Sequence, residues 1–134
     1  MHAGILDDQK ILIIEASRVF RLVLKEILTD KFPRSRLLEA RDGAEALKVV
    51  GEHDPDLAFV DIFLPDFNGL ALTRMIKGGH PGIAVVLVAD CDTPEYREAA
   101  LECGAAGFLS KDASIVSEIE PIVEAAMASE KKFL

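Results

Sequence analysis

Asp61, at the end of an apolar run, is the residue of this sequence whose position most suggests a chemical role. Residues 57–60 are apolar and of strand length, Asp61 follows them, and Pro65 cannot continue a strand because it has no backbone N–H. In an open α/β sheet, ligands bind just beyond the carboxyl ends of the strands, which is where Asp61 would lie. The alternative for a single acid is a loop residue that caps the next turn. The choice between these two interpretations depends on the elements around Asp61.

Five apolar segments that alternate with five helical patterns are expected to position this aspartate. We expect strands at residues 10–14, 36–40, 57–61, 83–88 and 107–110. We expect helices at residues 19–28, 43–50, 69–76, 94–103 and 115–127. Pro121 removes a backbone donor from the last helix and predicts a kink or a late start there. Because strand and helix alternate throughout, the sequence predicts an α/β fold with a parallel sheet covered by helices on both faces.

The composition predicts one compact domain of cytoplasmic type. The chain has 134 residues, half of them hydrophobic, and we expect a single domain over residues 1–134 with its core at about 9–130. No apolar run approaches the roughly 20 residues that cross a membrane, and residues 1–10 do not have the pattern of a signal peptide. Cys91 and Cys103 lack metal-ligand spacing, so we expect two reduced thiols.

The net charge of −8 excludes the basic footprint that direct nucleic-acid binding requires. The charge is also unevenly spread. After Lys10, the basic side chains up to residue 41 are Arg18, Arg21, Lys25, Lys31, Arg34, Arg36 and Arg41. Glutamates within residues 90–124 are Glu95, Glu98, Glu102, Glu118, Glu120 and Glu124. Two interpretations stay open: these are solvated helix faces, or they steer a charged protein partner.

Three segments in the right order resemble the receiver domain of bacterial response regulators. Residues 41–47, RDGAEAL, are similar to the start of the second helix in that family. Residues 55–69, PDLAFVDIFLPDFNG, resemble its third strand and the loop that follows. Residues 104–112, GAAGFLSKD, resemble its fifth strand. The resemblance covers the chain after about residue 9. It implies a flavodoxin-like, doubly wound sheet of five parallel strands in the order 2-1-3-4-5.

The resemblance also implies a site. In the family, an aspartate at the end of the third strand accepts a phosphoryl group from a phosphohistidine, and Asp61 matches that position. A lysine after the fifth strand contacts the phosphoryl oxygens, and Lys111 matches it, although a surface lysine is the alternative. A carboxylate is a competent nucleophile for this transfer, which depends mainly on positioning and charge neutralisation. Mg²⁺ is expected from the family, held by carboxylates and waters and, here, by the backbone carbonyl of Phe63.

The metal-binding acids depart from the family pattern. The family places two adjacent acids after its first strand, where this sequence has Glu15 and Ala16. Glu15 keeps one carboxylate, but Ala16 removes the acid that is normally a direct ligand, so we predict weak or absent Mg²⁺ binding. Asp7 and Asp8 precede the strand and are expected at the opposite edge of the sheet.

The switch positions depart from the pattern as well. The family has Thr or Ser after its fourth strand, whereas Ala89 has no hydroxyl. Asp90 follows it, either as a turn residue or, less expected, as a replacement metal ligand. Phe108 matches the family's switch aromatic, and an ordinary core phenylalanine would look the same.

Two functions follow from these observations, and neither is an enzyme beyond its own phosphotransfer. The first is a two-component receiver in which Asp61 accepts phosphate from a histidine kinase or histidine phosphotransfer domain. The second is a degenerate receiver that binds a partner without phosphorylation, because Ala16 and Ala89 replace the expected acid and hydroxyl. The partner is expected at the first helix, near Val19 and Phe20. A flavin carrier on the same topology is disfavoured because residues 15–18 form no phosphate cradle. The oligomeric state stays open.

Overall fold

The computed structural model describes residues 7–131; the other residues of the predicted domain lie outside that range. The strands are β1 (Lys10–Ile14), β2 (Arg36–Ala40), β3 (Leu57–Asp61), β4 (Ala84–Ala89) and β5 (Gly107–Ser110). The helices are α1 (Arg18–Lys31), α2 (Gly43–His53), α3 (Gly69–Gly79), α4 (Pro94–Glu102) and α5 (Ile115–Lys131). The alternation of strand and helix predicted from the sequence is confirmed.

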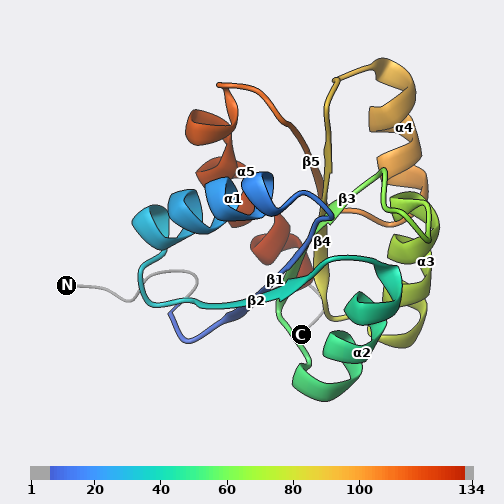
Figure 1. The fold of residues 1–134 in the computed structure, drawn as a ribbon, viewed down its shortest axis with the longest axis horizontal. Helices are drawn as coiled ribbons and strands as arrows, with labels where there is room; N and C mark the ends of the chain where they lie inside the picture. Colours follow the sequence, from blue (N-terminus) through green and yellow to red (C-terminus); the bar gives the residue numbers. More distant parts are fainter. Residues whose placement is uncertain (1–6, 132–134) are drawn as a thin grey trace.

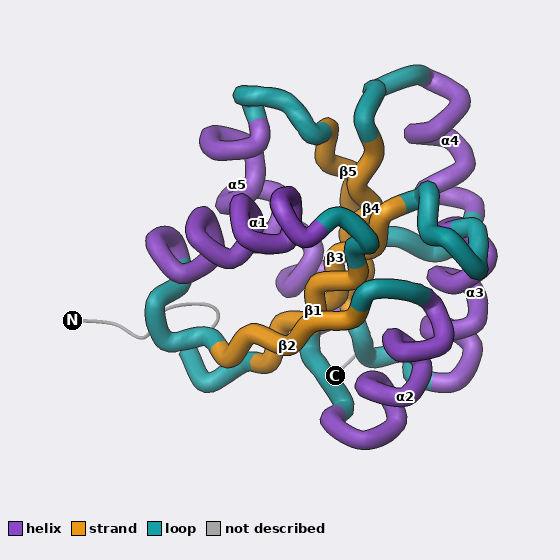
Figure 2. The backbone as a smooth tube through the Cα atoms, viewed as in Figure 1, coloured by secondary structure: helices purple, strands orange, loops and turns teal. Residues whose placement is uncertain are grey.

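The five strands form one parallel sheet in the order β2-β1-β3-β4-β5, as predicted. Helices α1 and α5 cover one face of the sheet, and α2, α3 and α4 cover the other (Figure 1). Figure 2 shows the strands as a central layer between the two groups of helices. The chain therefore has the doubly wound α/β fold, in which all strands end at one common edge. None of the helices within residues 7–131 has the length and apolarity that a membrane span requires.

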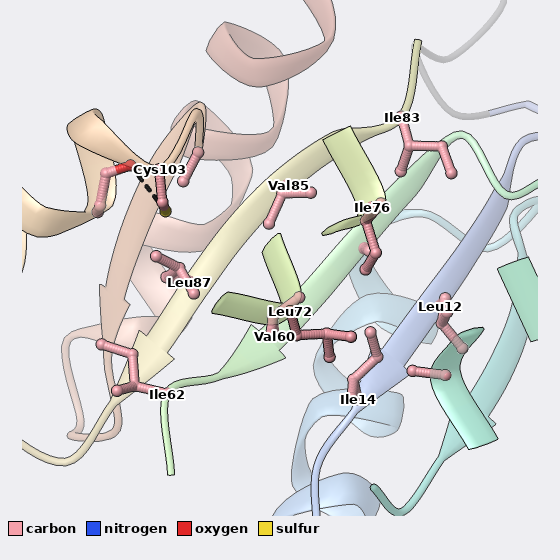
Figure 3. Packing of buried hydrophobic residues seen from close by; sticks show 14 of the residues in the cluster. Leu12, Ile14, Val60, Ile62, Leu72, Ile76, Ile83, Val85, Leu87 and Cys103 are labelled. Atoms are coloured by element: carbon pink, nitrogen blue, oxygen red, sulfur yellow. Dashed lines mark hydrogen bonds between the residues drawn. The ribbon is translucent and has the colours of Figure 1, made fainter. Parts of the chain in front are cut away.

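Each face of the sheet has its own apolar core because successive side chains of a strand point to opposite faces. Leu12 and Ile14 of β1 pack on the α2–α3–α4 side, whereas Ile11 and Ile13 pack on the α1–α5 side. Figure 3 shows the first of these cores, in which Leu72 of α3 lies beside the strands. The central strands are buried on both faces, which explains their continuous apolar sequences.

Side-chain caps fix where the helices begin, and these starts lie next to the strand ends. Ser17, Asp42, Asn68 and Thr93 each accept a hydrogen bond from a backbone N–H of the first helical turn. Of the kink or late start predicted at Pro121, the late start is wrong, since α5 begins at Ile115 and continues through Pro121. Pro121 is exposed, so water can solvate the carbonyl that its missing N–H leaves without a partner.

Candidate functional site

Three charged side chains meet at the carboxyl edge of the sheet. Glu15 follows β1, Asp61 ends β3, and Lys111 follows β5. The Lys111 Nζ atom lies 2.6 Å from Glu15 Oε1 and 2.9 Å from Asp61 Oδ2. Glu15 and Asp61 are buried, at 3% and 6% exposure, and 13% of the Lys111 side chain is accessible. The structure thus brings together the three charged residues that the sequence placed at this edge.

The backbone around Asp61 holds its carboxylate in place. Asp61 Oδ1 accepts a hydrogen bond of 3.0 Å from the backbone N–H of Phe63. The loop after β3 then folds back, because Gly69 N–H donates to Ile62 O at 2.7 Å. A Cβ atom on Gly69 would lie 2.2 Å from the carbonyl oxygen of Asp61, so no other residue fits there without a shift. Asp61 thus contacts the loop amide of Phe63 with one carboxylate oxygen and Lys111 with the other.

Glu15 is held by both of its oxygens. Glu15 Oε2 accepts a hydrogen bond of 2.8 Å from Ser17 N–H. Glu15 Oε1 is buried and makes no well-aligned hydrogen bond among the described residues; its contact is the ion pair with Lys111. Burial raises the pKa of Glu15, and the neighbouring Asp61 carboxyl raises it further, against the opposing effects of Lys111 and Ser17.

Lys111 is charged and doubly paired. Burial by itself would lower the pKa of Lys111, but its contacts with Glu15 and Asp61 outweigh burial and hold that pKa above the ordinary value. The Nζ atom also lies 4.7 Å from the centre of the Phe20 ring, an arrangement that stabilises a cation. The backbone N–H of Lys111 donates to Ala89 O at 2.8 Å, which ties the lysine to the end of β4.

The positions that depart from the family pattern contribute no polar group to this cluster. Ala16 is exposed beside Glu15, and Ala89 is buried at the end of β4. Within residues 7–131, no group of three or more His, Cys, Asp or Glu side chains is placed to hold a metal ion. Asp90 is exposed and does not join Glu15 and Asp61 in such a metal-binding group. The predicted position of Asp7 is confirmed: it pairs with Arg34, and Asp8 bonds to the same residue near the start of the sheet.

Two residues that secure the site were missed from the sequence. Asp66 Oδ1 and Oδ2 accept hydrogen bonds of 2.8 and 3.0 Å from the backbone N–H groups of Gly43 and Ala44, at the start of α2. The Gly43 amide in particular lowers the pKa of Asp66. The Phe67 ring fills the space in which a Gly43 Cβ would lie. The loop after Asp61 is therefore held against the start of α2.

The aromatic side chains near the edge have different surroundings. Phe63 is 56% exposed and packs edge-on against Tyr96 of α4, with ring centres 5.9 Å apart. Phe108 is buried on the α4 side of the sheet, with the Arg97 guanidinium 5.4 Å from its ring centre. Arg97 in turn makes two 2.6 Å hydrogen bonds with Asp92 in the β4–α4 loop. Phe108 is thus enclosed in the core by Arg97.

Residues 11–122 match the family described as response regulator receiver domain. This chain belongs to that family. It is a receiver domain of two-component signalling. Receiver domains typically bind Mg²⁺ and in general work with histidine kinases.

Individual relatives agree with this assignment. The chain is 31% identical to the chemotaxis protein CheY of Halobacterium salinarum, over 77% of this chain and 84% of that protein. It is 30% identical to the response regulator GacA of Pseudomonas syringae pv. syringae, over 84% of this chain and 53% of GacA. The receiver domain thus spans about half the length of GacA. The CheY-like receiver domain protein of Methanospirillum hungatei has the same fold, with a TM-score of 0.82 at 22% identity over 95% of this chain and 99% of that one.

Proposed function

We propose that Asp61 is the phosphoacceptor of this receiver domain and that Lys111 contacts the transferred phosphoryl group. The observation that carries the proposal is the 2.9 Å ion pair between Lys111 Nζ and Asp61 Oδ2 at the carboxyl edge of the sheet. A cation held at this distance is placed to neutralise charge on a phosphoryl group attached to Asp61. The donor is the phosphohistidine of a histidine kinase or histidine phosphotransfer domain.

The chemistry is a transfer between two side chains. A carboxylate oxygen of Asp61 attacks phosphorus, and the P–N bond of the phosphohistidine breaks. The imidazole leaves with the bonding electron pair and takes up a proton. The domain positions the carboxylate through the Phe63 N–H and supplies positive charge through Lys111, which is most of what such a transfer requires. The domain has no further catalytic activity in this proposal.

The metal site is the degenerate part of the pocket. Glu15, Asp61 and the backbone carbonyl of Phe63 are the groups of this chain that would hold Mg²⁺. Mg²⁺ requires near-octahedral geometry and is usually bound by one or two carboxylates together with waters. Here both carboxylates already contact Lys111, and Ala16 adds no ligand. We therefore propose that Mg²⁺ binds weakly and that Lys111 supplies most of the neutralising charge.

Weak Mg²⁺ binding leaves electrostatic repulsion in the phosphorylated state. Two like charges about 5 Å apart repel by ~3 kcal/mol at an effective dielectric constant near 20. One uncompensated repulsion of this kind between Glu15 and a phosphoryl group slows the transfer by about two orders of magnitude. We expect phosphorylation of Asp61 to be correspondingly slow.

Intact-mass spectrometry after incubation with phosphoramidate, with and without Mg²⁺, tests the proposal. We expect a slow gain of one phosphoryl group in the wild type and none in Asp61→Asn. The Ala16→Asp variant, which returns the missing acid, should gain the group faster when Mg²⁺ is present. Absence of any gain in the wild type and in Ala16→Asp would exclude Asp61 as a working phosphoacceptor.

The second candidate function is an interaction module that does not need phosphorylation. It is favoured by Ala89, which is buried and offers no hydroxyl to a phosphoryl group on Asp61. In both cases the partner is proposed to meet α1, where Val19 is 72% exposed next to Phe20. Binding of a kinase or phosphotransfer domain that is unchanged by Asp61→Asn and weakened by Val19→Asp would support the second function.

A further inference from the structure

The start of helix α1 is built into the candidate site. Glu15 Oε2 accepts a hydrogen bond of 2.8 Å from Ser17 N–H, and Ser17 Oγ accepts one of 3.2 Å from Phe20 N–H in the first turn of the helix. The Phe20 ring centre lies 4.7 Å from Lys111 Nζ, and this nitrogen pairs with Glu15 Oε1 at 2.6 Å. The contacts thus form a closed circuit that starts and ends at the Glu15 carboxylate.

The next residue of α1 fixes the turn that leads into the helix. Arg21 Nη1 donates to Glu15 O at 2.7 Å and to Ala16 O at 3.2 Å, and the Arg21 side chain is largely buried. Its Nε atom pairs with Glu39 Oε1 of β2 at 3.2 Å. Because Arg21 ties this turn to a strand of the sheet, it also fixes the position from which the Phe20 side chain reaches Lys111.

The Lys111 ammonium has more donors than carboxylate partners. An ammonium group carries three N–H donors. Within residues 7–131 its oxygen partners are Glu15 Oε1 and Asp61 Oδ2, and the side chain is 13% exposed, so water has little access to the remaining donor. The face of an aromatic ring attracts a cation, and more strongly where water is excluded. The Phe20 ring therefore supplies the third contact of the ammonium.

This third contact limits where the ammonium can go. Glu15 and Asp61 share the Lys111 charge, and Asp61 alone is the proposed phosphoacceptor. Lysine has a flexible four-carbon stem, so ion pairs by themselves leave its ammonium free to move toward one carboxylate or toward water. A ring in contact with Nζ opposes both movements. It also excludes water from the ammonium, which strengthens the effect of the charge on Asp61.

We propose that Phe20 is a positioning residue for phosphotransfer, which holds the Lys111 ammonium against Asp61 through the face of its ring. The inference rests on the proposed function of Asp61 as the phosphoacceptor, and Phe20 acts through Lys111 rather than on phosphorus itself. The alternative role is ordinary packing, because Phe20 is half-buried and also lies against the α1–α5 core. The two roles differ in one respect: only positioning depends on the electron density of the ring.

Site-specific replacement of Phe20 by phenylalanines that carry one, two and three ring fluorines tests the proposal. Fluorine withdraws electron density from the ring face with little change in ring shape, so the attraction to a cation weakens stepwise. We expect the folding equilibrium constant, measured by urea denaturation, to fall stepwise by about threefold or more across the series. In the Lys111→Met background this stepwise fall should disappear. The matched control is the same series at Phe32, at the other end of α1 in the same core, where the effect of fluorine should be equal with and without Lys111.

The rate at which phosphoramidate phosphorylates the same variants, followed by intact-mass spectrometry, tests the part of the proposal that concerns phosphotransfer. The rate should fall in the same order, by about threefold or more with three fluorines. Phe20→Leu, which removes the ring, should lose at least as much. Phe20→Tyr keeps an aromatic face and should stay within about twofold of the wild type, whereas a role in packing alone predicts no order with fluorine content.

The two measurements separate failure of this inference from failure of the proposed function. Stepwise losses of stability that are equal with and without Lys111, or no losses at all, would overturn the contact between Phe20 and the ammonium. Losses of stability that leave the rate of phosphorylation unchanged would overturn the role in phosphotransfer. A wild type that gains no phosphoryl group would refute Asp61 as phosphoacceptor and this role with it, while the unfolding data still decide whether Phe20 holds Lys111.

Discussion

Lys111 and Glu15 form a 2.6 Å ion pair that joins the ends of β5, an edge strand of the sheet, and β1, an inner strand. The two residues are 96 positions apart in the chain, and the pair lies beside Asp61. Lys111 therefore forms ion pairs with two carboxylates at once. It holds together the elements that surround the candidate phosphoacceptor.

Removing the charge of Lys111 should leave two buried carboxylates without a cation. We expect Lys111→Met to lower the free energy of unfolding by about 3 kcal/mol, the lower end of the range for breaking a buried ion pair, because part of the lysine is accessible. Lys48→Met, which alters an exposed lysine on α2, should change stability by less than about 0.5 kcal/mol. Urea denaturation of the two variants gives the comparison.

A double-mutant cycle with Glu15→Gln isolates the pair itself. If the ion pair couples the two residues, Lys111→Met should cost at least about 0.5 kcal/mol less in the Glu15→Gln background than in the wild type. Additive effects of the two substitutions would contradict the coupling.

Gly69 should not tolerate a side chain, because its Cβ would lie 2.2 Å from the carbonyl oxygen of Asp61. We expect Gly69→Ala to lower the free energy of unfolding by about 1–3 kcal/mol through overpacking. It should also shift the amide signals of Asp61 and Phe63. Gly51→Ala in α2 is the matched control: a Cβ there has no neighbour within 4 Å, and the substitution should stabilise the helix by about 0.5–1 kcal/mol. Thermal or urea unfolding measures both, and a neutral Gly69→Ala would contradict the close approach.

The fold could be predicted because the sequence marks its elements strongly. Apolar runs in the central strands, together with caps such as Ser17 and Thr93, define the alternation, and the predicted strand boundaries agree with the structure to within one residue. The edge that gathers Glu15, Asp61 and Lys111 follows from the strand ends alone, because parallel strands all end at the same side. The late start that Pro121 was expected to cause does not occur, since Pro121 is tolerated at an exposed position inside α5.

The contacts that hold the site residues in place could not be predicted, because they join elements that are distant in sequence. Nothing local to Asp66 indicates that its carboxylate reaches the start of α2, 22 residues earlier in the chain. The position of Phe20 over Lys111 depends on how α1 packs against the sheet and on side-chain rotamers. The need for glycine at position 69 depends on the path of the loop after Asp61. The residue types were visible in the sequence, but their partners were not.

The link between Asp66 and α2 should give the loop a pH-dependent stability. Hydrogen bonds from Gly43 and Ala44 lower the pKa of Asp66, so they stabilise its ionised form in the folded domain. A lowered folded-state pKa gives a contribution that is present above the ordinary aspartate pKa of about 3.9 and is lost as the pH falls through the lower, folded value. We expect wild type and Asp66→Ala to differ in urea midpoint at neutral pH, and that difference to shrink below about pH 4.

Hydrogen exchange distinguishes the loop contact from a general loss of stability. In Asp66→Ala the amides of Gly43 and Ala44 should exchange faster, while Val60 in the buried strand β3 keeps its relative protection. Asp42→Ala is a useful comparison, because it removes the other side-chain cap of α2, which bonds Glu45 instead. Unchanged exchange at Gly43 in Asp66→Ala would show that this contact does not hold the loop.

The acid missing at position 16 should control how the domain binds a divalent cation. Ala16 is exposed next to Glu15, and an aspartate there would add a third carboxylate beside Glu15 and Asp61. Because carboxylate number tunes the affinity of oxygen-ligand sites, we expect Ala16→Asp to bind Mn²⁺, used as a paramagnetic substitute for Mg²⁺, at least about tenfold more tightly than the wild type. Broadening of the Ile62 and Phe63 amide signals reports binding without any phosphorylation.

Ala71→Asp on α3 adds the same charge at another exposed position and should bind Mn²⁺ no better than the wild type. Equal Mn²⁺ affinity in wild type and Ala16→Asp would mean that Glu15, Asp61 and Phe63 suffice for the metal, and that the pocket is not degenerate.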